Sequence, residues 1–197
     1  MGLTFTIDNM AVALILDGEE RRPLGTGFCL IRPNWYVTAK HVVFVDGLPR
    51  RQLLIGTMQP QSIPATVMFA HPEVDLAILS AERDVCPHPL FPAHHSFAGG
   101  EGLISAGFAP SLSNCTAGKV LVNSIPRFSV EFRDRGTFTE ELVVFDAPYS
   151  EGGHSGGPIF GAGGGIVGVI IQNFSGATTL QARATGLAPL LAHLTIA

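Results

Sequence analysis

A serine lies inside a glycine-rich segment in the second half of the chain. Residues 151–158 read EGGHSGGP, with Ser155 between two pairs of glycines. Glycine frees the backbone for close approach of a ligand, and it allows two N–H groups to converge on one point, as an oxyanion hole requires. Ser155 is therefore a candidate nucleophile. A nucleophilic serine needs a general base within hydrogen-bond reach and a third group that orients the base.

Two upstream segments offer the base and the orienting group. Residues 37–43 read VTAKHVV and contain His41, and residues 74–79 read VDLAIL and contain Asp75. Each segment places its candidate residue, His41 or Asp75, at the edge of an apolar strand. The chain order His41, Asp75, Ser155 is the order of chymotrypsin-like β-barrel enzymes, and it differs from the orders found in subtilisin and in the α/β-hydrolases.

Two other motifs are excluded by the residues on their C-terminal side. Residues 153–157 also match the G-x-S-x-G elbow of α/β-hydrolases, but those enzymes place an acid and a histidine after the serine. Residues 156–197 contain no Asp or Glu. Residues 163–168 match the G-x-G-x-x-G pattern of dinucleotide sites, but the strand-like run 169–171 comes next, where a helix is needed. The sequence predicts a glycine-rich hairpin turn there.

Short apolar, β-branched runs recur between Gly and Pro residues, a rhythm typical of an all-β sandwich or barrel. The predicted strands span residues 11–16, 27–31, 35–39, 51–55, 65–69, 76–79, 102–106, 120–122, 141–145, 158–160 and 166–171. Residues 86–100, rich in Pro and Gly, are predicted to link two β units of similar size. Residues 127–141 are predicted to form a solvated hairpin or loop. Leucines at 187, 190, 191 and 194 predict a short C-terminal helix over residues 187–196.

Five segments together resemble the motifs of the chymotrypsin-like, or trypsin-fold, serine proteases. They are residues 25–28 (GTGF), 38–42 (TAKHV), 75–79 (DLAIL), 153–158 (GHSGGP) and 168–170 (GVI). They are most similar to the disulfide-free bacterial branch that includes the HtrA-type protease domains. The resemblance implies two six-stranded antiparallel β-barrels with the active site in the cleft between them, one over residues 1–90 and one over residues 91–197.

The same resemblance implies a role for each matching residue. Ser155 attacks the scissile carbonyl, His41 takes and returns the proton, and Asp75 holds the imidazole tautomer. The backbone N–H groups of Gly153 and Ser155 form the oxyanion hole. No metal and no cofactor is required. The implied function is that of a serine endopeptidase.

The resemblance places the S1 pocket in two segments of the second barrel. The implied pocket residues are Tyr149, Glu151, Gly152, Ile171, Gln172 and Asn173. Tyr149 stands six residues before the serine, where trypsin has its acid, which disfavours a basic P1 residue. Glu151 and Asp146 keep a basic P1 residue open, but we expect an apolar one.

His154 departs from the family pattern. Secreted trypsin-like members carry Asp before the serine, which pairs with a newly cut N-terminus, and HtrA-like members usually carry Asn. Activation by N-terminal cleavage is therefore not expected. His154 and the flexible Gly152-Gly153 pair also support a second interpretation, a catalytically silent or partner-activated trypsin-fold module that serves in binding or regulation. An esterase that uses the same residues stays open.

Composition limits the class of partner. Of the 197 residues, 14% are charged, compared with about 25% in an average soluble domain. The net charge is -4 and no Lys/Arg cluster is longer than a pair, so nucleic acid is not an expected partner. No apolar stretch approaches the roughly 20 residues that span a bilayer, so no membrane contact is expected. The expected partners are a protein or peptide substrate and a regulatory protein.

The cysteines and the first residues suggest a compartment. Cys29, Cys86 and Cys115 are odd in number and contain no C-x-x-C pair, which predicts buried thiols without a disulfide framework. The start of the chain lacks a basic segment followed by a long apolar one. A cytoplasmic location is expected. A second, weaker hypothesis for these side chains is a zinc site formed by Cys86, His88, His94 and His95. It is weaker because their spacing lacks a second ligand motif.

Overall fold

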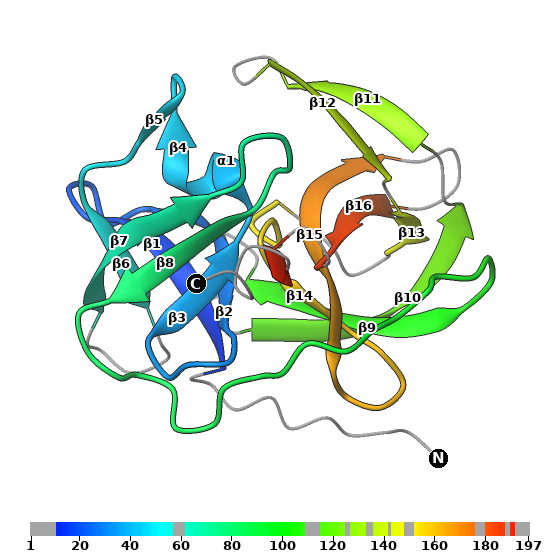
Figure 1. Ribbon diagram of the computed structural model, residues 1–197, viewed down its shortest axis with the longest axis horizontal. Coiled ribbons are helices and arrows are strands. Elements are labelled where there is room, and N and C mark those ends of the chain that lie inside the picture. Colours follow the sequence, from blue (N-terminus) through cyan, green and yellow to red (C-terminus); the bar gives the residue numbers. More distant parts are fainter. Residues whose placement is uncertain are drawn as a thin grey trace.

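The computed structural model describes residues 11–56, 62–108, 115–124, 127–132, 136–141, 143–147, 152–175, 180–187 and 190–191. The chain folds into two closed barrels of six antiparallel strands each, which lie next to one another (Figure 1). The prediction of two six-stranded antiparallel barrels is confirmed. Closing a sheet on itself removes its exposed edges, which in an open sheet are sites of aggregation.

The N-terminal barrel has the strand order β1-β2-β3-β8-β7-β6. Its strands are β1 (Val12–Asp17), β2 (Pro23–Cys29), β3 (Trp35–Thr38), β6 (Leu53–Gly56), β7 (Ile63–Ala70) and β8 (Ala77–Ala81). Strand β7 shows how the sequence selects its faces, since Ile63 and Ala65 are buried while Thr66 and Met68, on the other face, are exposed. Side chains alternate across a strand, so this pattern fixes the register.

A short helix and a small hairpin follow β3. Helix α1 (Lys40–Val43) leads into β4 (Phe44–Val45) and β5 (Leu48–Pro49). Asp46 and Gly47 connect the two strands with φ values of 51° and 76°. Two consecutive left-handed residues of the type Asp-Gly are favoured in a two-residue hairpin turn. Neither α1 nor this hairpin is predicted by the apolar pattern of the sequence.

The C-terminal barrel has the strand order β10-β13-β16-β15-β14-β9. Its strands are β9 (Gly102–Phe108), β10 (Cys115–Ser124), β13 (Val143–Asp146), β14 (Pro158–Phe160), β15 (Ile166–Ser175) and β16 (Leu180–Gly186). Strands β11 (Arg127–Phe132) and β12 (Gly136–Glu141) form a separate hairpin, as predicted for residues 127–141. The predicted glycine-rich turn joins β14 to β15, where the Gly161 N–H donates to the Gly165 carbonyl over 2.9 Å.

The segment between β8 and β9 contacts both barrels. Leu90 forms a parallel β-bridge with Leu30 of the first barrel, and Pro92 forms one with Ile166 of the second. The segment thus acts as the linker expected from its Pro and Gly content. The division between residues 90 and 91 falls inside it and stays a prediction.

One hydrophobic cluster is shared by the two barrels. It contains Val12 and Phe28 from the first barrel, Val169 from the second, and Leu187 and Leu190 from the C-terminal segment. Strand β9 packs against β1 and β2 at this junction. The backbone of residues 190 and 191 is helical, and the rest of the predicted C-terminal helix lies largely outside the described residues. In the part of the chain that the structure describes, no helix has the length and apolar character needed to cross a membrane.

Candidate active site

His41 and Asp75 come together because β3 and β8 are paired. Thr38, the last residue of β3, is opposite Ala77, the first of β8. The residues just beyond these ends, in α1 and before β8, therefore lie side by side. The Nδ1 atom of His41 lies 2.7 Å from Oδ2 of Asp75. The backbone N–H of His41 donates to the other carboxylate oxygen, Oδ1, over 2.8 Å.

Asp75 is almost completely buried, with 1% of its surface exposed. Burial raises the pKa of Asp75 to about 7, while the positive charge of Lys40 and a Lys40 backbone hydrogen bond lower it. The Lys40 ammonium is held nearby by a hydrogen bond to the His71 carbonyl over 2.9 Å. An ionised Asp75 accepts the Nδ1 proton of His41, and this selects the tautomer whose Nε2 can act as a base.

Glycines shape the turn that carries Ser155, which precedes β14. Gly153 and Gly156 have φ values of 96° and 88°, a region that L side chains rarely adopt. A Cβ atom on Gly156 would overlap with the Thr26 carbonyl oxygen and the Thr38 hydroxyl. The Gly156 N–H donates to the Ile170 carbonyl over 2.6 Å, which attaches the turn to β15.

The Ser155 turn of the second barrel touches the part of the first barrel that carries His41. A Cβ atom on Gly25 would lie 2.7 Å from Val42 Cγ2 and 2.8 Å from the Ser155 carbonyl oxygen. Gly25 thus lies between the Ser155 turn and α1, in which Val42 directly follows His41. The Thr26 N–H also donates to the Ser155 carbonyl over 2.8 Å. The structure therefore brings the His41–Asp75 pair and the serine turn to one place.

Gly153 and Ser155, the predicted oxyanion donors, are both partly exposed, whereas His154 between them is 3% exposed. This alternation leaves the serine accessible to a substrate while its neighbour packs inward. The Gly153 carbonyl accepts a hydrogen bond from the Thr26 hydroxyl over 2.7 Å.

The predicted S1 residues are only partly within the described chain. Tyr149 and Glu151 lie outside it, as does the side chain of Asn173. Gly152 is exposed, and Gln172 is partly exposed. Ile171 is 1% exposed and belongs to the core cluster of the first barrel. The register between β15 and β16 shifts at this residue, and such a bulge changes the direction of a side chain.

Sequence reasoning missed three residues that hold the serine turn: Thr26, Gly107 and Thr116. Residues 25–28 form one of the family-like motifs, but no pattern indicates that the Thr26 hydroxyl reaches a carbonyl 127 positions away. Gly107 and Thr116 lie on paired strands that the sequence predicts only in part. Their signal is absent because the contacts are non-local.

No zinc site is formed among the described residues, where no three His, Cys, Asp or Glu side chains come together. Cys86 is 1% exposed and packs in the core of the first barrel. His95 pairs instead with Glu101, with 3.0 Å between Nε2 and Oε2.

Comparisons with known proteins identify the family and the fold of this chain. A family model described as a trypsin-like peptidase domain matches residues 25–169. A curated protein of Chlamydia pneumoniae, named a probable periplasmic serine endoprotease DegP-like, is 27% identical over 152 residues, which are 77% of this chain and 29% of that protein. The chain thus spans less than a third of the length of this curated relative.

Solved structures share the fold. The active form of the Rv3671c protease from M. tuberculosis is 25% identical, with a TM-score of 0.77 over 95% of this chain and 80% of the other. The HtrA-type protease AlgW with a tripeptide is 18% identical, with a TM-score of 0.74 over 95% of this chain and 60% of the other. The resemblance to trypsin-fold, HtrA-type serine proteases is confirmed.

The expectation of a cytoplasmic location is contradicted, because the Chlamydia relative is named a periplasmic protein. The odd number of cysteines was a weak indicator of compartment. Cys29 and Cys86 are 0% and 1% exposed, so packing shields both thiols from oxidants in any compartment.

Proposed function

Because this chain belongs to the trypsin-like peptidase domain family, we propose that it is a serine endopeptidase that hydrolyses peptide bonds through an acyl-enzyme. One observation carries the proposal. The first barrel supplies a His41–Asp75 pair with 2.7 Å between Nδ1 and Oδ2, and Gly25 lies between α1, which contains His41, and the turn of the second barrel that contains Ser155. A base with its orienting group beside an accessible hydroxyl is what nucleophilic catalysis needs.

The reaction proceeds in two halves. Ser155 Oγ attacks the carbonyl carbon of the scissile bond while its proton passes to His41 Nε2, and Asp75 stabilises the resulting imidazolium. The carbonyl oxygen becomes an oxyanion, held by the N–H groups of Gly153 and Ser155, each contributing about 2.7–4 kcal/mol in related enzymes. The intermediate collapses, the C–N bond breaks, and the amine leaves with the proton of His41.

Water completes the second half. It attacks the acyl-enzyme carbonyl and gives its proton to His41. The ester bond to Ser155 then breaks, the carboxylic acid leaves, and the serine regains its proton. No metal or cofactor takes part in this proposal.

The proposed substrates are protein or peptide chains with an apolar P1 residue. The AlgW structure, an HtrA-type protease with a bound tripeptide, supports a peptide-binding cleft in this fold. The position six residues before the serine holds Tyr149, not an acid. We also propose that a regulatory protein partner controls the activity, because the serine turn contains the unusual Gly152-Gly153-His154 sequence.

Labelling with a fluorophosphonate probe tests the nucleophile. We expect the wild type to be labelled, Ser155→Ala not to be, and Ser80→Ala, a partly exposed serine on β8, to be labelled like the wild type. An unlabelled wild type, or equal labelling of Ser155→Ala, would overturn the proposal.

A peptide-library cleavage profile separates the alternatives. Cleavage of peptide bonds after apolar residues is expected. If the protein hydrolyses ester substrates but leaves the peptides uncleaved, the result would favour an esterase. If neither peptides nor esters are hydrolysed until a protein partner is added, the result would favour the partner-activated module.

A further inference from the structure

Two threonine hydroxyls connect the serine turn to a single peptide group of β9. The Thr26 hydroxyl donates to the Gly153 carbonyl over 2.7 Å and accepts the Phe108 N–H over 2.9 Å. The Thr116 hydroxyl lies 2.9 Å from Nε2 of His154 and donates to the Gly107 carbonyl over 3.3 Å. The Gly107 carbonyl and the Phe108 N–H belong to the same peptide group.

The roles in the Thr116 contacts follow the tautomer of His154. A hydroxyl has one proton, so when Thr116 donates to the Gly107 carbonyl it accepts from His154 in the tautomer that carries its proton on Nε2. Thr26 likewise uses its proton for Gly153 and its lone pair for Phe108. Each threonine is thus a bridge between one residue of the turn and one side of the shared peptide group.

The side chains of Thr26 and His154 are tightly packed at these hydrogen bonds. A Cβ atom on Gly107 would overlap with the His154 ring, so only glycine allows the imidazole to lie on β9. Thr26 is 0% exposed and His154 is 3% exposed. A buried polar group that loses its partner cannot replace it with water, so the bridges are costly to break.

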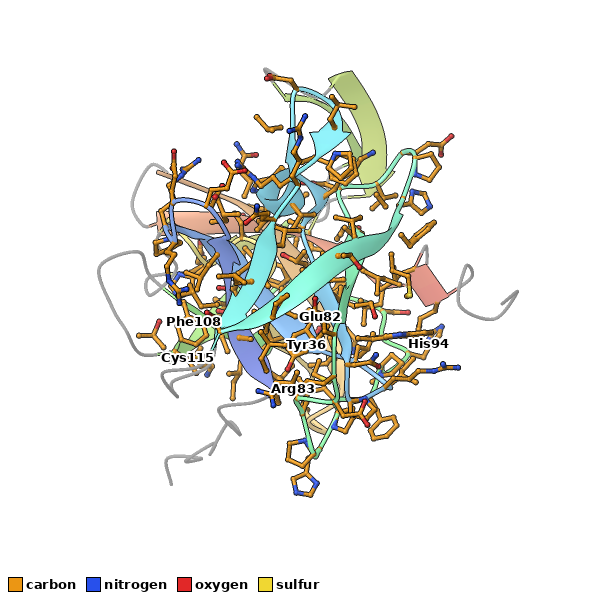
Figure 2. The ribbon with its side chains drawn as sticks, turned by 90° about the vertical axis from the view of Figure 1, so that its left-hand side faces the viewer. Tyr36, Glu82, Arg83, His94, Phe108 and Cys115 are labelled. Atoms are coloured by element: carbon orange, nitrogen blue, oxygen red, sulfur yellow. The ribbon has the colours of Figure 1, made fainter. Side chains whose placement is uncertain are left out.

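The two bridges meet where β9 and β10 pair. Thr116 is opposite Gly107, and Cys115 is opposite Phe108. Figure 2 shows the side chains of Phe108 and Cys115 next to each other at this point. Thr26 reaches the same point from β2 of the other barrel, so the anchor joins both halves of the molecule.

We propose that Thr26 and Thr116 are positioning residues of the hydrolytic reaction, whose hydroxyls fix Gly153 and His154 on the Gly107–Phe108 peptide and so order the oxyanion donors before substrate binds. This inference rests on the proposed function. Donors stabilise a transition state best when they are already oriented, because no energy is then spent on reordering them during the reaction. All of these anchors come from the interior of the chain, so cleavage of an N-terminus is not needed to set them.

The test compares threonine, valine and serine at both positions. Thr116→Val and Thr26→Val keep the side-chain shape and remove the hydroxyl, whereas Thr116→Ser and Thr26→Ser retain it. Thr66→Val is the matched control, since it makes the same change at an exposed position of β7. The measurements are kcat and KM on a peptide amide, and the inhibition constant of a peptide boronic acid, whose tetrahedral adduct occupies the oxyanion hole.

We expect each valine variant to lower kcat by about 10- to 100-fold with KM changed less than about threefold. Boronate affinity should fall in parallel. The serine variants should recover most of the loss, and Thr66→Val should match the wild type. Because both bridges hold one peptide group, the double valine variant should lose less than the product of the two single losses.

Folding is checked separately by thermal unfolding. If Thr26→Val does not fold, Thr116→Val and its serine counterpart still decide the result, because Thr116 is less buried. Wild-type kcat in a folded Thr116→Val would overturn the inference, as would equal losses in kcat for the valine and serine variants. Failure of the proposed function has a different signature, which is a wild type without peptidase activity and without labelling at Ser155.

Discussion

Asp75 combines two opposing influences on one carboxyl group. Its 1% exposure favours the neutral acid, whereas the positive charge of Lys40 and a backbone hydrogen bond from Lys40 favour the carboxylate. The carboxylate is the form that directs the Nδ1 proton of His41 away from the serine. The buried Asp75 carboxyl therefore sets both the tautomer of His41 and the pH range in which His41 acts as a base.

Replacing Asp75 by asparagine tests the first of these effects. Asp75→Asn preserves the shape but selects the wrong imidazole tautomer, and we expect kcat on a peptide substrate to fall by about 10⁴-fold with little change in KM. The matched control is Asp46→Asn at the exposed tip of the β4–β5 hairpin, where asparagine tolerates the positive φ. A loss of less than tenfold in Asp75→Asn would show that the pair does not act as base and orienter.

The pH dependence tests the second effect. Burial raises the pKa of Asp75 to about 7, so the folded protein retains a proton on the His41–Asp75 pair up to a higher pH than an exposed aspartate would. The active form lacks that proton. We therefore expect kcat/KM to fall as the pH drops below about 7 and to recover above it, while the circular dichroism spectrum stays constant. A flat kcat/KM between pH 5 and 8 would contradict this assignment.

The turn before β14 requires glycine at position 156 because it lies very close to the first barrel. Gly156 combines a φ of 88° with a position against the Thr26 carbonyl and the Thr38 hydroxyl of the first barrel. Gly164, in the β14–β15 turn, has a similar φ of 80° but nothing within 4 Å of its would-be Cβ. A substitution at Gly164 therefore reports backbone strain alone, whereas one at Gly156 reports backbone strain together with steric overlap.

Alanine at these two glycines should have unequal effects on stability. Gly164→Ala is expected to lower the free energy of unfolding by about 1–2 kcal/mol, from the positive φ alone. Gly156→Ala adds overpacking of roughly 1–3 kcal/mol, giving a total of about 2–5 kcal/mol. Urea unfolding followed by tryptophan fluorescence measures both values. Equal losses in the two variants would mean that the turn can move away from the first barrel.

Local patterns in the sequence predicted some elements well and others poorly. The all-β class follows from short apolar runs and from turn residues, which act over a few positions, whereas the two six-stranded barrels follow from the resemblance to the trypsin-fold proteases. Strand β16 was missed because Leu180–Gly186 (LQARATG) contains no continuous apolar run, and its pairing with β13 and β15 is non-local. Helix α1 was missed because four residues are too few to show a helical period.

The candidate site divides in the same way. His41, Asp75 and Ser155 were selected by residue type, order and neighbouring glycines, and their catalytic roles stay predictions. The bridges through Thr26 and Thr116 were not predictable, because each depends on a contact between residues 38 to 127 positions apart. Candidate catalytic residues can be recognised in the local sequence, whereas the hydrogen bonds that orient them depend on the tertiary fold.

At the scale of the whole molecule, the site depends on the two barrels staying together. Helix α1, which contains His41, and strand β8, which follows Asp75, lie in the first barrel, whereas β14, which follows the Ser155 turn, lies in the second (Figure 1). The shared cluster with Phe28, Val169 and Leu190 buries apolar surface from both, and β9 packs against β1 and β2. An interface of this kind should make the barrels unfold as one cooperative unit.

Phe28→Ala tests that cooperativity, because Phe28 is 0% exposed in the shared cluster. Removing a buried phenylalanine typically costs about 3–5 kcal/mol, and here the cost should lower one common transition for both barrels. Phe91→Ala is the control, since Phe91 is 66% exposed and should leave stability within about 0.5 kcal/mol of the wild type. Differential scanning calorimetry measures the number of transitions, and fluorophosphonate labelling during heating reports the site. We expect labelling to disappear at the single melting temperature, shifted equally in both signals by Phe28→Ala. Two separate transitions, with labelling lost at the first, would instead show that the barrels fold independently and that the site fails when their contact opens.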